Sequence, residues 1–371
     1  MRQTLMHPTE SSLRGSNLSV AAFLNQPASW KNGVLGTLCF AANAAERKIA
    51  DMGVAGIPVL PVHMPRLDAE DSVCEVWHGH GDGPLTQGQS GTIHYRHDDD
   101  VVFGAIILHE SEFEASAGKL PLQRAAEAAY RQIFALLNTL PFPYVFRYWN
   151  YFAQINAHSF GLERYRQFNL GRQDAFTALR RDYAAITSPS PIHVPAACAL
   201  GTAQGPLTIA FLAGRSAPLN IENPRQVSAY HYPAQYGARS PLFARASLAR
   251  VRQEDVLFIS GTASVVGHET LHAGDVVAQT RETLINIEAV LAEANRMRAA
   301  NQPPFEMADL NYKVYVRRPL DLPQIRNELM RCAGTAPKAV YLQADVCRED
   351  LLLEIEACAA QPVAPVADGK Y

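Results

Sequence analysis

The order of apolar segments restricts the fold more than any other feature, because a strand, a helix and a second strand follow one another in both halves of the chain. In the first half, an apolar run at residues 101–108 is short enough to be a buried strand. Apolar residues then recur at helical spacing from Ala125 to Leu137, and the helix ends before Pro141. The aromatic run at residues 144–152 predicts the next strand.

The second half of the chain repeats this order. A β-branched run at residues 256–266, punctuated by glycine and serine, predicts an interrupted strand. Apolar residues at helical spacing predict a helix from about Asp275 to Arg298, and residues 311–317 predict the strand after it. We interpret the repetition as weak internal symmetry between two α+β lobes that meet face to face.

The remaining segments set the expected boundaries of the lobes. An apolar run at residues 206–213 predicts a strand between them. We expect an N-terminal α+β lobe at residues 1–200 and a C-terminal lobe at residues 201–360. The Pro- and Ala-rich tail, residues 361–371, is expected to be disordered.

Composition indicates a globular enzyme or binding protein rather than a nucleic-acid or membrane protein. Of the 371 residues, 48% are hydrophobic, which is ample for a core, and the formal net charge is −3. Scattered basic residues favour neither nucleic acid nor an anionic membrane as a partner. No window approaches the roughly 18 apolar residues of a membrane span, and the N-terminal residues lack the apolar core of a signal peptide, so we expect a cytoplasmic protein. Six cysteines without CxxC spacing predict reduced thiols.

The segment His268–His272 has the letters of the HExxH zinc signature. That signature requires a helix, because two histidines four residues apart reach one Zn²⁺ only from the same helical face. Here it follows the interrupted strand and precedes the predicted helix, so we expect two loop histidines and no metal. The chain also lacks the GxSxG, GxGxxG and Walker patterns of serine hydrolases and nucleotide-binding proteins.

Two glutamates lie on one face of the last predicted strand, residues 351–358. Alternation places Glu354 and Glu356 together with Leu352 and Cys358. One interpretation is a solvent-facing edge, because charged residues are usually exposed. The other is a partly desolvated glutamate whose raised pKa lets it act as a general acid near neutral pH.

Arginines and aromatic residues are concentrated in three segments, at residues 147–151, 163–172 and 236–245. Arginine presents a planar fork of donors that matches carboxylates, and aromatic walls suit a flat ligand. The segments therefore favour a pocket for a small, flat anion, although each arginine alone could simply cover core aromatic residues.

Longer motifs resemble two related families. The segments at residues 258–270, 274–291 and 353–357 resemble the YjgF-type, or reactive-intermediate deaminase, fold. Across both lobes, RYWNYFAQIN (147–156), ERYRQFNLGR (163–172), RSPLFARA (239–246) and FISGTASVVGHET (258–270) resemble the chorismatases. The resemblance implies two YjgF-like or chorismate-mutase-like lobes of mixed sheet with helices packed on one face, and a metal-free enzyme without a cofactor.

Chorismatases remove pyruvate from chorismate, and the resemblance assigns roles to individual residues. It implies that Glu354 protonates the enolpyruvyl group and that Tyr232 lies near the ring. Arg147, Arg164 and Arg239 are candidates for the two carboxylates of chorismate. Lys338 stands where YjgF-type proteins have a carboxylate-binding arginine.

Cys347 and Gly261 bear on the product. The resemblance associates them with enzymes that form 3-hydroxybenzoate, in which the ring's 4-hydroxyl displaces pyruvate. The alternatives are a hydrolase that yields a dihydrodiol, a mixed 3- and 4-hydroxybenzoate synthase, and a non-catalytic protein that binds aromatic acids. Two fused lobes also favour a monomer over the trimer of YjgF-type proteins.

Overall fold

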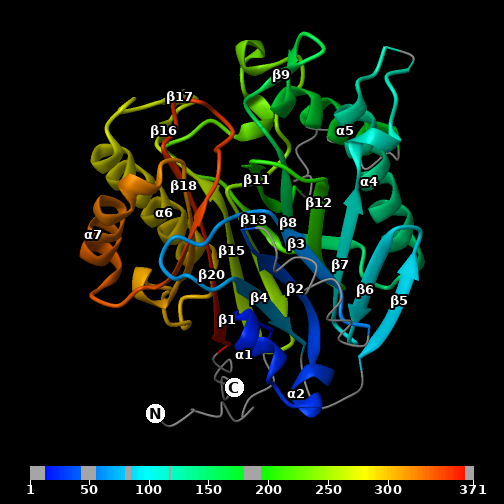
Figure 1. Ribbon diagram of the computed structural model, residues 1–371. Helices are drawn as coiled ribbons and strands as arrows, with labels where there is room; N and C mark the ends of the chain where they lie inside the picture. Colours follow the sequence, from blue (N-terminus) through cyan, green and yellow to red (C-terminus); the bar gives the residue numbers. More distant parts are fainter. Residues whose placement is uncertain (1–12, 43–55, 80–84, 117, 179–193, 364–371) are drawn as a thin grey trace, which may run out of the picture.

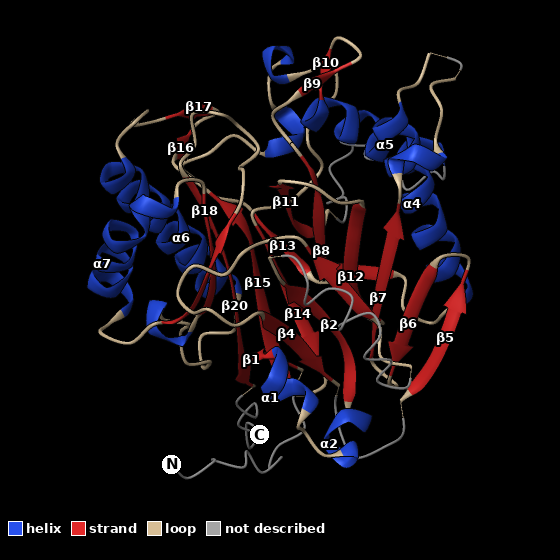
Figure 2. Cartoon of the chain, viewed as in Figure 1, coloured by secondary structure: helices blue, strands red, loops and turns tan. Residues whose placement is uncertain are grey.

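The computed structural model describes residues 13–42, 56–79, 85–116, 118–178 and 194–363, and it has two six-stranded mixed sheets side by side (Figures 1 and 2). Two helices cover the outer face of each sheet, and a smaller four-stranded sheet lies at one end. The fold is therefore α+β, as predicted.

The first lobe contains one six-stranded sheet and two long helices. Its strands are β5 (Thr86–Ser90), β6 (Ile93–His97), β7 (Val101–Leu108), β8 (Tyr144–Ala153), β11 (Ala196–Thr202) and β12 (Leu207–Gly214), and its helices are α4 (Pro121–Thr139) and α5 (Arg164–Ala178). Apolar residues of α4, among them Ile133 and Leu137, pack on the sheet with Phe152 and Phe211. The predicted helical face of α4 and the strands β7 and β8 are confirmed.

The second lobe is built in the same way. Its strands are β13 (Leu219–Ile221), β14 (Ala246–Val251), β15 (Glu254–Thr262), β18 (Asn311–Val316), β19 (Lys338–Gln343) and β20 (Leu353–Pro362), and its helices are α6 (Val276–Met297) and α7 (Leu322–Ala333). Asp275 caps α6 by accepting a hydrogen bond from the backbone N–H of Ala278, and Gly334 follows α7 at a φ of 93°. The expected break in the strand at residues 256–266 separates β15 from β16 (Val265–Val266).

The two sheets have the same strand order, which confirms the internal symmetry. The first runs β5-β6-β7-β12-β8-β11 and the second β13-β14-β15-β20-β18-β19. Across each sheet, the first three strands form a meander and the last strand of the lobe lies beside them. The two remaining strands are those that flank the second helix of the lobe in the sequence. Within these two sheets, as far as the residues are described, the pairs β8–β11 and β18–β19 are parallel and the others antiparallel.

The sheet pairing bears on the expected lobe boundary between residues 200 and 201. This boundary falls inside β11, and the strand expected between the lobes is β12, which pairs with β7 and β8 inside the first sheet. The first sheet thus extends to Gly214. Gln361 and Pro362, expected in a disordered tail, belong to β20 and pair with β15. Residues 364–371 of that tail lie outside the described residues.

The inner faces of the two sheets pack against each other and against the four-stranded sheet, of order β1-β4-β2-β3. This sheet consists of β1 (Arg14–Ser19), β2 (Val34–Phe40), β3 (Val59–Val62) and β4 (Val73–His78), with the short helices α1 (Val20–Leu24) and α2 (Ala28–Asn32) beside it. Their shared core includes Phe40, Trp77, Trp149 and Phe258. The side chains of this shared core are therefore largely buried.

One pair of cysteines contradicts the prediction of reduced thiols. Cys39 on β2 and Cys74 on β4 lie opposite each other in the antiparallel register and form a disulfide. Their 35-residue separation gives no spacing signal in the sequence. The other four cysteines are free. Among the described residues, no helix is long and apolar enough to span a membrane.

Candidate active site

The last strand, β20, brings two carboxyl groups into the interior of the protein. It lies between β15 and β18 in the second sheet, so it is not an edge strand. Its apolar residues Leu353, Ile355 and Ala357 pack toward the helices α6 and α7. Alternation therefore turns Glu354 and Glu356 toward the first lobe, where each is only 4% exposed. The solvent-facing interpretation of these glutamates is wrong.

Glu354 lines a cavity between the two lobes. Helix α5 and strand β11 of the first lobe form one side, and β15, β20 and two loops form the other. The lining residues are Tyr165, Phe168, Asn169, Arg172, Ala197, Cys198, Ala199, Pro241, Phe243, Gly261, Cys347 and Glu354. The structure thus brings together the three predicted catalytic residues, Glu354, Cys347 and Gly261.

The surroundings of Glu354 favour its protonated form. Burial raises the pKa of Glu354 to about 8, with a further increase from the negative charge of Glu356 and an opposing effect of Arg147. The thiol of Cys347 is also neutral, because burial and the nearby Glu354 raise its pKa to about 12. At neutral pH the carboxyl group therefore holds a proton that it can deliver into the cavity.

Gly261 leaves the room that this carboxyl group occupies. A Cβ atom at position 261 would lie 1.8 Å from Oε1 of Glu354 and 3.3 Å from Cβ of Cys198. Backbone conformation does not require glycine here; the close approach of the glutamate does. Any larger residue at this position would move the proton donor.

Arg172 on α5 is the cation of the cavity. Its side chain is 3% exposed and its guanidinium carbon lies 5.1 to 5.5 Å from the ring centroids of Tyr130, Tyr148 and Phe176. Its Nε and Nη2 atoms have no hydrogen-bond partner among the described residues. Buried polar atoms are nearly always hydrogen-bonded, so these free donors indicate a place for an anion.

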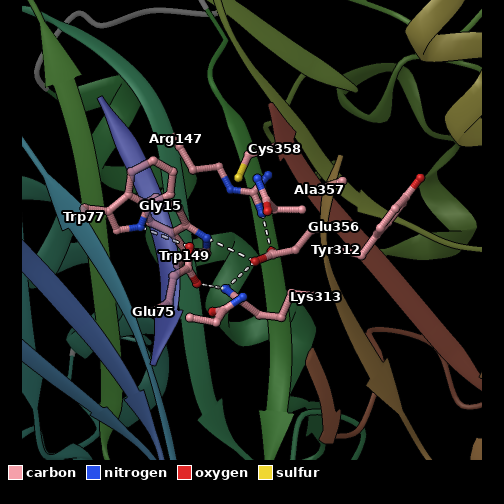
Figure 3. Close-up of a pocket in the computed structure, with 12 residues that line it drawn as sticks. Gly15, Glu75, Trp77, Arg147, Trp149, Tyr312, Lys313, Glu356, Ala357 and Cys358 are labelled. Carbon is pink, nitrogen blue, oxygen red and sulfur yellow. Dashed lines mark hydrogen bonds and ion pairs between the residues drawn. The ribbon is translucent and has the colours of Figure 1, made fainter. Parts of the chain in front are cut away.

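Arg147, a predicted carboxylate ligand, is instead held inside the protein by Glu356 (Figure 3). Its second terminal nitrogen donates to the backbone oxygen of Ile259 at 2.7 Å. Glu356 also accepts from Lys313 at 2.6 Å and from the indole of Trp149 at 3.2 Å. These residues border a second cavity, on the four-stranded-sheet side of β20.

The other predicted binding residues do not line the cavity around Glu354. Arg164 forms an ion pair with Glu110 and donates to the backbone oxygen of Ala153. Arg239 is exposed, and Lys338 is exposed at the start of β19. They are not brought together with the three catalytic candidates.

Tyr232 lies one layer behind the cavity wall. Its hydroxyl accepts a hydrogen bond from Arg245 at 2.9 Å, and the guanidinium of Arg348 lies 5.3 Å from its ring. Arg245 in turn stacks on Phe243, which lines the cavity. Tyr232 therefore supports the loop that forms this wall.

The HExxH segment does not form a helix. Glu269 and Thr270 form the short strand β17, His272 has a positive φ of 59°, and α6 begins only at Val276. The predicted position before a helix is confirmed. No group of three or more His, Cys, Asp or Glu residues is arranged to hold a metal ion within the part of the chain described.

The sequence interpretation missed the roles of Tyr165, Asn169 and Arg172. All three lie in the segment at residues 163–172, which was singled out for its arginines and aromatic residues. Helix α5 buries polar residues toward the cavity, so it lacks the apolar stripe that predicts a helix. The sequence signal for these residues was the richness of the segment in arginine and aromatic residues, not a periodic spacing of apolar residues.

Comparisons with known proteins show which family the chain resembles. Residues 75–213 match the family model described as chorismatase FkbO/Hyg5-like, N-terminal. The chain is 39% identical to a 3-hydroxybenzoate synthase of Streptomyces hygroscopicus, over 81% of its own length and 85% of that protein. The chain belongs to the chorismatase family.

Two further relatives support this assignment. A second chorismatase of Streptomyces hygroscopicus is 36% identical over 83% of the chain and 85% of the relative. A crystal structure of a chorismatase matches 95% of the chain and all of the solved chain, with a TM-score of 0.79 and 31% identity. The family predicted from the motifs is confirmed, and the match extends over both lobes.

Proposed function

We propose that this chorismatase converts chorismate into 3-hydroxybenzoate and pyruvate. The observation that carries the proposal is that a protonated glutamate, Glu354, and an arginine with two free N–H donors, Arg172, line the same cavity. Chorismate needs both, because it carries two carboxylates and an enol ether that must be protonated. The 39% identity to a 3-hydroxybenzoate synthase supports the same activity.

Arg172 binds a substrate carboxylate in this proposal. Its free donors match a carboxylate oxygen pair, and the burial of the guanidinium strengthens the attraction. Tyr165, Phe168 and Phe243 give the cavity flat walls suited to the cyclohexadiene ring. Of the arginines predicted from sequence, Arg147 and Arg164 are occupied by carboxylates of the protein, so we favour Arg172 for this role.

Glu354 starts the reaction by donating its proton to the methylene carbon of the enolpyruvyl group. The side chain then has oxocarbenium character, and its ether bond to ring carbon 3 weakens. The 4-hydroxyl oxygen attacks carbon 3, pyruvate leaves with the ether oxygen, and the hydroxyl proton returns to Glu354. The resulting arene oxide opens, and its oxygen takes up a proton. The ring loses a proton to solvent and becomes aromatic. The atoms of chorismate are thus fully accounted for by 3-hydroxybenzoate and pyruvate.

Cys347 and Gly261 direct the product by excluding water from the reacting carbon. The neutral thiol of Cys347 and the space at Gly261, filled by the Glu354 carboxyl group, leave the ring hydroxyl as the nucleophile. Water in this place would yield the dihydrodiol of a chorismate hydrolase. Formation of some 4-hydroxybenzoate is the nearest variant of the proposed reaction.

We infer that one chain suffices for activity and that it works in the cytoplasm as a monomer. The cavity is lined by Arg172 and Cys198 of the first lobe and by Gly261 and Glu354 of the second, so both halves of the site come from one chain. Size-exclusion chromatography with light scattering tests the oligomeric state. The location rests on the sequence alone, and cell fractionation tests it.

Release of pyruvate distinguishes the enzyme from the competing class, a non-catalytic protein that binds aromatic acids. Purified protein is mixed with chorismate, and pyruvate is followed through lactate dehydrogenase and the oxidation of NADH. Continuous pyruvate release that the Glu354→Gln substitution slows by about 100-fold or more supports the proposal. Binding of chorismate by calorimetry without pyruvate release would replace it with the binding-protein interpretation.

A further inference from the structure

Glu354 has a second carboxylate, Glu356, two residues along the same face of β20. Glu356 pairs with two buried cations, Arg147 and Lys313 (Figure 3). We propose that Glu356 is a positioning residue. By pairing with Arg147, it offsets the positive charge that would otherwise favour the ionised form of Glu354. The inference rests on the proposed role of Glu354 as the acid. It adds an electrostatic function for a group that does not line the substrate cavity.

The cations and carboxylates around Glu356 form a closed cluster of four buried groups. Arg147 and Lys313 both pair with Glu356, and Lys313 also pairs with Glu75. None of the four side chains is more than 9% exposed. The indoles of Trp149 and Trp77 donate to Glu356 and Glu75 at 3.2 and 3.0 Å. With two positive and two negative charges, the cluster has no net charge.

The elements around the cluster explain why it is held so firmly. Arg147 comes from β8 of the first lobe, Lys313 from β18 and Glu356 from β20 of the second, and Glu75 from β4 of the small sheet. The cluster therefore joins all three sheets at the point where they meet (Figure 3). Such a cluster stabilises the junction of the sheets whether or not it acts on Glu354.

That effect follows from the separation of two residues along one strand. Side chains two residues apart on a strand share a face, so Glu354 and Glu356 are neighbours in a medium where charges are poorly screened. Arg147, close enough to act on both, lowers the pKa of Glu354, whereas the negative charge of Glu356 raises it. Arg147 and Lys313 hold the pKa of Glu356 itself low despite its burial, so Glu356 stays charged. Without this charge, the cation of Arg147 would favour an ionised Glu354.

The phenols and thiols that face Glu354 carry no charge near pH 7. Burial raises the pKa of the phenols and thiols around it, so they remain neutral near pH 7. These groups are Tyr315 on β18, whose hydroxyl bonds to Tyr151, Cys198 on β11, Tyr165 on α5, and Cys347 in the loop before β20. Arg172 on α5 lines the same cavity, and Arg348 adjoins Cys347 and stacks on Tyr236. Along β20, the charged group nearest to Glu354 is Glu356 with its cluster.

The test compares variants that leave different net charges in the cluster, using the pH dependence of kcat for pyruvate release. Glu356→Gln leaves a net charge of +1, so the alkaline midpoint is expected to move down by about one pH unit or more. The paired variant Arg147→Met with Glu356→Gln leaves no net charge and is expected to bring the midpoint back toward that of the unchanged protein. Lys313→Met leaves a charge of −1 and is expected to move the midpoint up.

A second readout does not depend on turnover. The infrared carbonyl band of a protonated carboxyl group, assigned by its loss in Glu354→Gln, is titrated in each variant without substrate. If the unchanged protein releases no pyruvate, the proposed function fails, while this titration still tests the effect of Glu356 on Glu354. The same order of midpoints in both readouts supports the inference.

Opposite results would overturn it. If the cluster has only a structural role, Glu356→Gln should have a lower melting temperature and lower activity at every pH, with an unchanged midpoint. Removal of one partner from a buried pair is often strongly destabilising, so a second variant is needed in case Glu356→Gln does not fold. In that case Lys313→Met decides, and a midpoint in Lys313→Met equal to that of the unchanged protein contradicts the proposal.

Discussion

The carboxyl group of Glu354 occupies the space that a side chain at Gly261 would need. A Cβ atom at position 261 would come within 1.8 Å of Oε1 of Glu354. The strand β15 thereby sets the position of a group on its neighbour β20, with which it pairs through a register shift between Ile259 and Thr262. A single methyl group is expected to change the chemistry of the site.

Gly261→Ala should lower kcat by about 100-fold, because displacement of a reacting group by an ångström has an effect of that order. Steady-state kinetics with chorismate measures it. Gly33→Ala is the matched control, since a Cβ there meets nothing closer than 3.3 Å and the position lies outside the cavity. Equal kinetics of the two alanine variants would contradict the steric account of Gly261.

The pH dependence of kcat/KM should show loss of activity on the alkaline side. Glu354 acts as an acid only while protonated, and its pKa is raised by burial to about 8. Activity is therefore expected to be retained at pH 7 and to fall as the pH rises through about 8. A profile that stays flat to pH 10 would show that the donor is another group.

Arg172→Met and Arg164→Met form a matched pair. The guanidinium of Arg172 has free donors in the cavity, whereas Arg164 is paired with Glu110 outside it. We expect Arg172→Met to lower kcat/KM by roughly 10- to 150-fold, as loss of a charged hydrogen-bonded partner costs about 1.5–3 kcal/mol. Arg164→Met should change it little. The reverse order of effects would restore Arg164 as the carboxylate ligand predicted from sequence.

Glu354→Gln should be slower and, at neutral pH, more stable than the unchanged protein. Loss of a general acid typically lowers the rate by about 10²–10⁴-fold. The pKa of Glu354 is raised in the folded protein, so the unfolded chain releases this proton at a lower pH than the folded one. The unchanged protein therefore loses stability relative to Glu354→Gln as the pH rises from about 4 to about 8.

Denaturant unfolding at a series of pH values tests this prediction. The difference in unfolding free energy should be smallest near pH 4 and should grow to the order of a few kcal/mol by pH 8. A constant difference across this range would mean that Glu354 is ionised in the folded protein. The site would then lack its proton donor.

Cys347→Ala should change the products rather than stop the reaction. The smaller side chain admits water beside the reacting carbons, so we expect dihydrodiol in addition to 3-hydroxybenzoate. Chromatography of the quenched reaction measures the ratio. An unchanged ratio would assign Cys347 to the cavity wall with no influence on the product.

Periodic segments of the sequence were sufficient to predict most of the repeated fold. The apolar spacing of α4 and the alternation along β20 each survive in the structure because one face of each element packs into a core. The four-stranded sheet was largely missed, since the strand β1 (RGSNLS) has no apolar alternation. The place of β12 was also beyond the sequence pattern, because strand order depends on pairings between distant segments.

For the site, the sequence distinguished residue types but not their partners. Glu354, Cys347 and Gly261 meet in one cavity as expected from the motifs. The sequence suggests that Arg147 binds substrate. In the structure it pairs instead with Glu356, which is 209 residues away in the chain. Which arginine remains free is decided by long-range pairing, so Arg172 became apparent only in three dimensions.

The measurement that tests the central claim most directly is the identity of the products. Purified protein is incubated with chorismate, and the reaction is separated by chromatography against 3-hydroxybenzoate, 4-hydroxybenzoate and the dihydrodiol, with pyruvate determined in parallel. We predict 3-hydroxybenzoate as the main product, in a one-to-one ratio with pyruvate. Dihydrodiol as the main product would contradict the intramolecular displacement, and unchanged chorismate would contradict the proposed activity altogether.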